Sequence, residues 1–217
     1  MWINQFHKTP DFCIVIFKHY DMKRQICLLF ILMLVVFTTN AQQKSTSEKS
    51  DQASNHSYGV AVDLLPIVMS ATQGKLGYSA QLWYGYKHIR FRGLIAGFTM
   101  PDKLMGNDDF TNLETTATAV IIDYFPQKDF KGWWFGASFE MWNNSITSKI
   151  DDSSHDFNNY VATASLGYIV PVYKKFYIEP WGAFHYVLNN EKVSVGNTEY
   201  KTKKFQAEIS IKVGLKF

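Results

Sequence analysis

Ionisable side chains recur at every second position in several segments of the chain, and a histidine lies among them. An imidazole beside a carboxylate is a pairing that general acid–base catalysis uses. The alternative is a static network, because a charge buried without an opposite partner is costly. The side chains concerned are Asp63, Arg90, Arg92, Asp123, Glu140, Glu179, His185, Glu208 and Lys212. The elements that carry these residues decide between the two interpretations.

The clearest of these elements is the segment 205–217, FQAEISIKVGLKF. Apolar residues occupy every odd position from Phe205 to Phe217, and the even positions hold polar residues and one glycine. Alternation of this kind predicts a β-strand with one apolar and one polar face. Glu208 and Lys212 fall on the polar face.

Seven further segments alternate in the same way, and no amphipathic helical pattern interrupts them. Turn-forming residues separate the segments, for example Gln73 with Gly74 and Lys87 with His88. The eight predicted strands span 58–69, 77–87, 89–99, 115–125, 132–147, 158–171, 176–188 and 203–217. This series predicts an all-β fold.

The lengths of the connections indicate how the strands are arranged. The second, fourth and sixth connections, at 87–88, 126–131 and 172–175, are short, and most of the others are longer. Short turns on one side and longer loops on the other are typical of an up-and-down membrane barrel with an even number of strands. We therefore predict an eight-stranded antiparallel transmembrane β-barrel. The interior of such a barrel is just wide enough for side chains to fill. We therefore predict that the ionisable side chains fill the lumen and pair with one another.

Aromatic residues support this prediction at the ends of the strands. If the apolar positions face outward, each strand places one aromatic side chain on the side of the short turns. The predicted girdle at this membrane interface consists of Tyr58, Tyr86, Phe91, Tyr124, Trp133, Tyr168, Phe176 and Phe217.

Two strands break the pattern. Gly93 and Gly97 fall on the outward face of the third strand, while Leu94 and Phe98 fall inward. This predicts a bulge or a shift of parity there. Pro180 in the seventh strand cannot donate to the ladder, so we expect a local irregularity around it.

The N-terminal 41 residues have the layout of a cleaved secretory signal peptide. A basic start at Met22, the apolar run 26–37 and small residues up to Ala41 follow one another. Met22 is the predicted true start, residues 42–57 form a flexible polar lead-in, and 58–217 form the barrel. Both cysteines, Cys13 and Cys27, lie in the removed part, so we expect no thiol or disulfide chemistry in the mature chain.

The balance of basic and acidic residues indicates which kinds of partner the chain could bind. The chain has 22 basic and 19 acidic residues, and this near-balance gives no indication of a nucleic-acid partner. Lys201, Lys203 and Lys204 would lie at the outer rim, where they either contact lipopolysaccharide phosphates or form a solvated patch.

With its signal peptide, eight strands and terminal IKVGLKF, the chain resembles the small outer-membrane barrels of the OmpA and OmpX kind. The resemblance implies a place in the cell outer membrane, among its lipids and lipopolysaccharide. It also implies that Phe217 is the signal read by the barrel-assembly machinery. We expect a structural role or a loop-mediated surface interaction with an unknown extracellular ligand, without cofactor or catalysis.

Two alternatives stay open beside this expectation. Lipid A deacylase barrels also have eight strands and place a serine two residues after the histidine, but this chain has Val187 at that position after His185. A small-solute pore is the other alternative. The bulk of Trp83, Trp142 and Trp181 on the inward face favours a closed lumen.

Overall fold

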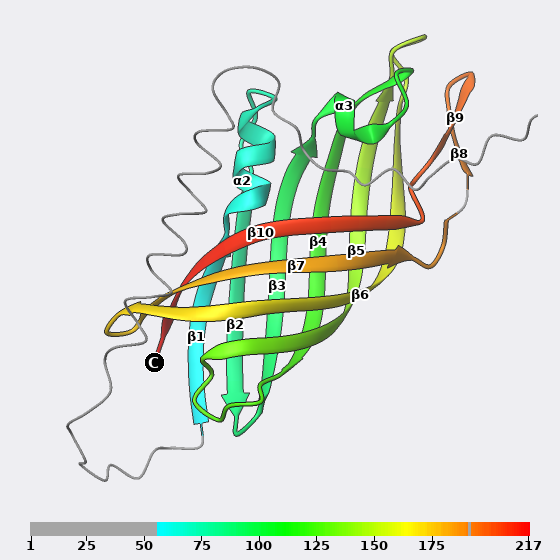
Figure 1. Ribbon diagram of the computed structural model, residues 1–217. Coiled ribbons are helices and arrows are strands. Elements are labelled where there is room, and N and C mark those ends of the chain that lie inside the picture. Colours follow the sequence, from blue (N-terminus) through cyan, green and yellow to red (C-terminus); the bar gives the residue numbers. More distant parts are fainter. Residues whose placement is uncertain (1–55, 191) are drawn as a thin grey trace, which may run out of the picture. The chain divides into compact units, whose positions relative to one another are not determined.

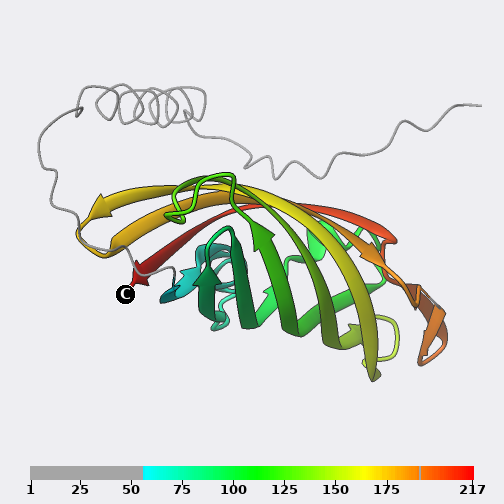
Figure 2. The ribbon, with the colours of Figure 1, turned by 90° about the horizontal axis from the view of Figure 1, so that it is seen from below.

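The computed structural model of the protein describes residues 56–190 and 192–217, so the predicted signal peptide and most of the lead-in lie outside the described residues. Eight antiparallel strands close into a barrel in the order β1-β10-β7-β6-β5-β4-β3-β2 (Figures 1 and 2). The strands are β1 (His56–Asp63), β2 (Tyr78–Tyr86), β3 (Ile89–Met100), β4 (Phe110–Tyr124), β5 (Gly132–Ser148), β6 (Ser154–Tyr173), β7 (Phe176–Val187) and β10 (Phe205–Lys216). The predicted eight-stranded up-and-down fold is confirmed.

The two faces of the wall differ in polarity as alternation predicts. Leu82 and Val120 point outward and are each 69% exposed, whereas Arg90 and Asp123 point inward and are completely buried. Apolar side chains outside and charged side chains inside are the reverse of a soluble barrel. This arrangement is that of a barrel whose outer face lies in lipid.

The first strand is shorter than predicted. The segment 58–69 was expected to be one strand, but β1 ends at Asp63 and continues as the helix α2 (Leu64–Ala71). Pro66 explains the difference, because proline removes a ladder donor from a strand but is tolerated in the first turn of a helix. Asp63 caps α2 by accepting a 3.0 Å hydrogen bond from the Leu65 N–H. The strand itself starts at His56, two residues inside the predicted lead-in.

The long connections contain regular structure that the alternation did not predict. A short helix, α3 (Asp102–Met105), lies between β3 and β4. A two-stranded hairpin, β8 (Lys192–Val195) and β9 (Thr198–Lys201), lies between β7 and β10 (Figure 1). Within 56–190 and 192–217, no helix has both the length and the apolarity to cross a membrane.

The irregularity expected in the third strand is absent. β3 keeps an unbroken register with both β2 and β4, so that prediction was wrong. The outward glycines have another explanation. A Cβ at Gly97 would collide with the Tyr78 ring, and Gly93 has open space above it.

The irregularity expected at Pro180 is confirmed. The ladder between β6 and β7 runs to Gly167 opposite Trp181 and resumes at Val170 opposite Ile178. The two pairings between these positions are missing, and one of them would involve Pro180. Proline has no N–H to donate, which accounts for the interruption.

Candidate functional site

The middle of the lumen holds an ion-pair network centred on Arg90. Its guanidinium donates to Asp123 at 2.7 Å and to both oxygens of Glu179 at 2.9 and 3.1 Å. Arg90 and Asp123 are completely buried, and Glu179 is 1% exposed. Bidentate geometry of this kind is among the strongest pairings available to a buried guanidinium.

Arg92 extends the network toward β2. It donates to Asp123 at 2.7 and 2.9 Å and to the Gln81 side chain at 2.9 Å. The Lys212 ammonium lies 3.8 Å from Glu179 and 3.6 Å from the centre of the Trp181 ring. Together with Asp63, the network balances three carboxylates against three cations.

Asp63 connects the network to the wall above it. Its carboxylate accepts a 2.8 Å hydrogen bond from the Trp181 indole and another from the Ser210 hydroxyl, while it also caps α2. One carboxylate therefore fixes the end of β1, the start of α2 and the inner face of β10.

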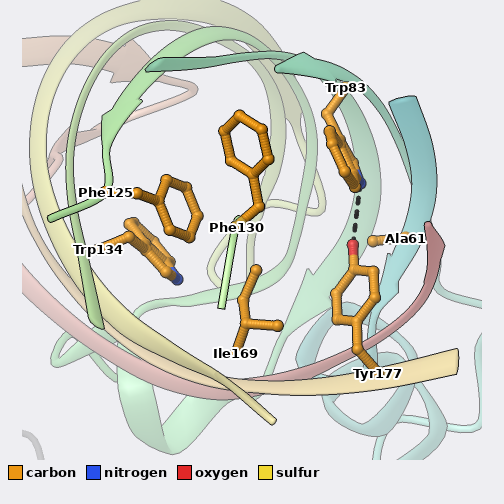
Figure 3. Packing of buried hydrophobic residues seen from close by; sticks show 7 residues of the cluster. All are labelled: Ala61, Trp83, Phe125, Phe130, Trp134, Ile169 and Tyr177. Atoms are coloured by element: carbon orange, nitrogen blue, oxygen red, sulfur yellow. Dashed lines mark hydrogen bonds between the residues drawn. The ribbon is translucent and has the colours of Figure 1, made fainter. Parts of the chain in front are cut away.

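An aromatic layer closes the lumen on the side of the short turns (Figure 3). Phe125 and Phe130 come from the connection between β4 and β5 and turn inward, next to Trp134. Trp83 donates a 2.9 Å hydrogen bond to the Tyr177 hydroxyl across the layer. The layer consists of Ala61, Trp83, Phe125, Phe130, Trp134, Ile169 and Tyr177.

The aromatic layer and the ion network are in direct contact. The guanidinium carbons of Arg90 and Arg92 lie 5.2 and 4.9 Å from the centre of the Trp134 ring, and Arg90 also lies over Phe125 at 5.0 Å. A cation over an aromatic face is attracted by the ring quadrupole, more strongly when both are desolvated. The two layers therefore stabilise each other.

His185 lies above the ion network, with polar side chains at both ring nitrogens and the Trp142 ring 5.4 Å from its own. One ring nitrogen, Nδ1, is 2.8 Å from the Thr163 hydroxyl, and the other, Nε2, is 3.0 Å from Glu208. Glu140 lies 3.8 Å from Nδ1 and accepts a 2.8 Å hydrogen bond from the Trp142 indole. Both ring nitrogens thus have partners, and neither is directed at open space where a substrate could lie.

The long loops form a second apolar cluster over the other end of the barrel. Phe110 and Ile146 are completely buried there, and Phe110 lies outside the strand 115–125 that alternation predicted. The cluster comprises Met105, Phe110, Leu113, Ile146, Val195 and Tyr200, with Met100, Phe157 and Val193 against it. A cavity of about 30 Å³ remains beneath it, room for one or two water molecules.

Hydrogen bonds tie the loops of this cap to each other. Asp151 accepts from the Ser153 hydroxyl at 2.6 Å and from the Asn197 N–H of the hairpin at 3.0 Å. These bonds, that from Ser153 first, lower the pKa of Asp151 to about 2. Burial raises the pKa of Tyr200 to about 12. The cap is therefore a packed structure in which the loops support one another.

The residues of the predicted girdle lie on the outer face at the short-turn end. Seven of the eight are between 37% and 57% exposed. Tyr168 is half-buried because its ring packs edge-on against Trp133 at 5.2 Å, opposite it in the ladder. Phe217 exchanges two backbone hydrogen bonds with Tyr58, at 2.7 and 3.3 Å, and so closes the ring of strands at this end.

The nine predicted lumen residues all point inward. Eight of them are buried, and the Glu208 side chain is 25% exposed. Sequence reasoning missed Thr163 as a partner of His185, and it missed Phe125 and Phe130 as a seal. The two phenylalanines on either side of a polar turn could have indicated that this turn folds into the lumen. Among the described residues, no group of three or more His, Cys, Asp or Glu is arranged to hold a metal ion.

Solved structures with a similar fold include outer-membrane barrels. The N-terminal β-barrel domain of OprF from Pseudomonas aeruginosa matches with a TM-score of 0.46 and 12% identity, over 75% of this chain and 98% of that one. A major outer membrane protein from Thermus thermophilus matches with a TM-score of 0.47 and 9% identity, over the same shares. No protein-family model and no curated protein sequence matches the chain. By its own topology and its apolar outer face, the protein is an integral β-barrel of the outer-membrane type.

Proposed function

We propose that the protein is a closed scaffold of the cell outer membrane that carries a packed cap of loops at the surface. The observation that supports this is the filling of the lumen at three successive levels: the aromatic layer, the ion network and the apolar cluster of the cap. Eight strands leave little internal width once side chains occupy it. A solute therefore has no continuous path, and the alternative of a small-solute pore is disfavoured.

The cap is the part proposed to meet partners outside the cell. Loops on a rigid frame are where binding residues concentrate. Here the hairpin β8–β9 packs Val195 and Tyr200 against Phe110 of β4, so the loops present one fixed surface. Lipids and lipopolysaccharide surround the wall in this proposal, and the barrel-assembly machinery inserts the chain.

Planar-bilayer recording tests the closed lumen. We expect the refolded protein to give no steady current. A variant with Phe125→Ala, Phe130→Ala and Trp134→Ala loses the aromatic layer but keeps the residues of the ion network and the cap, so it should stay closed as well. A stable current from the unmodified protein would overturn the proposal in favour of a pore.

The enzymatic alternative is tested separately. His185 lies between the Thr163 hydroxyl and the Glu208 carboxylate, an order that a catalytic triad also has. His185 and Thr163 are only 5% and 6% exposed inside the filled lumen, and this burial supports a structural role over catalysis. We expect lipid A from cells with the protein, without it, and with His185→Ala to have the same mass spectrum. A deacylated lipid A that appears only when His185 is present would show that the protein is an enzyme.

A further inference from the structure

The wall of the barrel has a notch beside the loop-side half of β10. β1 pairs with β10 only through residues 59–63, which lie opposite 212–216. Residues 205–211 of β10 pair with β7 on their other side, and no strand within 56–190 or 192–217 pairs with their free edge. The shortening of β1 at α2 thus leaves seven residues of β10 without a second neighbour in the sheet.

The ladder determines which backbone groups face this notch. Tyr58 and Phe217 exchange both hydrogen bonds, and such pairs alternate along an antiparallel ladder. The odd residues of β10 therefore direct their N–H and C=O toward β1. Beyond the end of β1 these residues are Phe205, Ala207, Ile209 and Ile211. No hydrogen bond to these groups across the notch is found among the described residues.

Apolar side chains border the notch on both sides. Ile209 is 84% exposed and Phe205 is 72% exposed, more than almost any other outward side chain of the wall. Across the notch, α2 exposes Ile67 and Val68, by 38% and 50%. Figures 1 and 2 show β10 running away from α2 toward its own N-terminal end.

Positive charge lies at the loop-side end of β10, next to the notch. Lys203 and Lys204 immediately precede β10 and are exposed, and Lys201 ends β9. The Lys203 ammonium donates to the Leu104 carbonyl, in the connection after β3, at 3.3 Å. The Lys204 ammonium lies 5.2 Å over the Tyr186 ring of β7, on the other side of β10. None of the three lysines has an ion pair with a carboxylate in the described part of the chain.

We propose that this notch is a binding site for lipid A, the phosphorylated and acylated anchor of lipopolysaccharide. Its phosphates would meet Lys203 and Lys204, and one acyl chain would lie between Ile209 and α2. The amide groups of its acyl linkages can donate to and accept from the unpaired backbone groups at the free edge of β10, and the ester groups can accept from them. Backbone groups left unpaired at membrane depth are costly, so a ligand that satisfies them gains affinity. This site rests on the outer-membrane location proposed above, whereas bilayer recording tests the closed lumen independently of it.

The choice of lipid A over other occupants follows from the combination of features. A phospholipid chain alone would cover Ile209 but would not match a cluster of cations. A free phosphate would meet the lysines but would leave the apolar border uncovered. An extended peptide would pair with the edge, yet nothing in the position of the lysines requires it. A ligand that carries anionic groups, amide groups and acyl chains matches the lysines, the unpaired edge and the apolar border together.

Native mass spectrometry of the refolded protein in detergent tests the proposal with bisphosphorylated lipid A as the probe. We expect one lipid A to stay bound. Lys203→Gln with Lys204→Gln should weaken binding by roughly fivefold for each lysine, the effect typical of one basic residue at an anionic lipid surface. Ala207→Trp should block the notch and abolish retention of the lipid.

Two matched controls separate the notch from the rest of the surface. Lys174→Gln with Lys175→Gln removes the same charge at the opposite end of the barrel. Ala164→Trp adds the same bulk at an exposed outward position on β6. Both should bind like the unmodified protein, and heat-modifiable mobility on gels verifies that every variant is folded.

Several outcomes would overturn the proposal. Equal binding by the notch variants and their controls is one, and equal retention of a zwitterionic phospholipid of the same chain length is another. Full displacement of lipid A by millimolar inorganic phosphate would reduce the site to the lysines alone. Binding of an apolar peptide strand in place of lipid A would assign the edge to a protein partner.

Discussion

Arg90 and Glu179 face each other across the lumen from β3 and β7 and meet through two hydrogen bonds of 2.9 and 3.1 Å. Neither strand is a neighbour of the other in the barrel. The pair therefore links opposite walls, and its loss should be felt by the whole barrel.

The first prediction concerns this pair. Glu179→Met should lower the free energy of unfolding by about 3–5 kcal/mol, because it leaves a buried guanidinium short of one partner. Arg90→Met should cost a similar amount, and the double variant less than the sum. Urea unfolding in lipid vesicles, followed by tryptophan fluorescence, measures the cycle. Strictly additive losses would show that the two side chains are not coupled.

The second prediction separates lipid from water on the outer surface. Val120→Arg places a charge on the wall and should cost roughly 2–4 kcal/mol near the middle of the bilayer. Leu76→Arg is the matched control, because Leu76 is 98% exposed in the connection between α2 and β2. Its cost should be near zero in the same unfolding assay. Equal costs at the two positions would contradict the membrane assignment of the wall.

The third prediction concerns Phe217 as an assembly signal. Phe217→Asp should lower the amount of protein assembled in the outer membrane of cells, while Phe217→Tyr, which keeps an aromatic ring, should not. Refolding of the purified Asp variant should stay efficient, because the backbone bonds between Phe217 and Tyr58 need no particular side chain. Cell fractionation and heat-modifiable mobility measure both. If assembly in cells is unchanged, the residue is not a signal.

The fourth prediction concerns pH and the cap. Asp151 has a pKa of about 2 in the folded protein, below the value of about 3.9 for a free side chain. The anchoring of the hairpin through Asn197 is therefore complete above about pH 4 and weakens as pH falls toward 2. The amide resonance of Asn197, followed by NMR between pH 6 and 2, should report this. Asp151→Asn should remove the transition, and a midpoint near 4 in the unmodified protein would contradict the bonding described.

Much of the wall could be predicted from the sequence, because alternation determines both the strand and the face of each residue. Tyr86 and Arg90 were assigned to opposite sides on this basis. The helix α2 could not be predicted from parity. Its sequence, LLPIVMSA, is apolar at nearly every position, and only Pro66 argued against a strand.

The sequence predicted which residues face the lumen, but it did not predict which of them contact each other. Thr163 meets His185 because these two residues are opposite each other in the ladder of β6 and β7. Register is set by the whole closed sheet, and a shift of one residue would exchange every such partner. The seal by Phe125 and Phe130 depends on a turn folding inward, which periodicity does not encode.

The aromatic seal belongs to the connection between two neighbouring strands of the wall and is not a separate plug body. Phe125 and Phe130 are carried by the ends of that connection, and Phe130 holds a positive φ of 53°, as the inward turn requires. A plug with its own fold can leave a barrel intact when it moves. In this protein, Phe125 and Phe130 cannot leave the lumen unless the connection between β4 and β5 changes its conformation. The closure of the lumen therefore depends on the same segment that joins two strands of the wall.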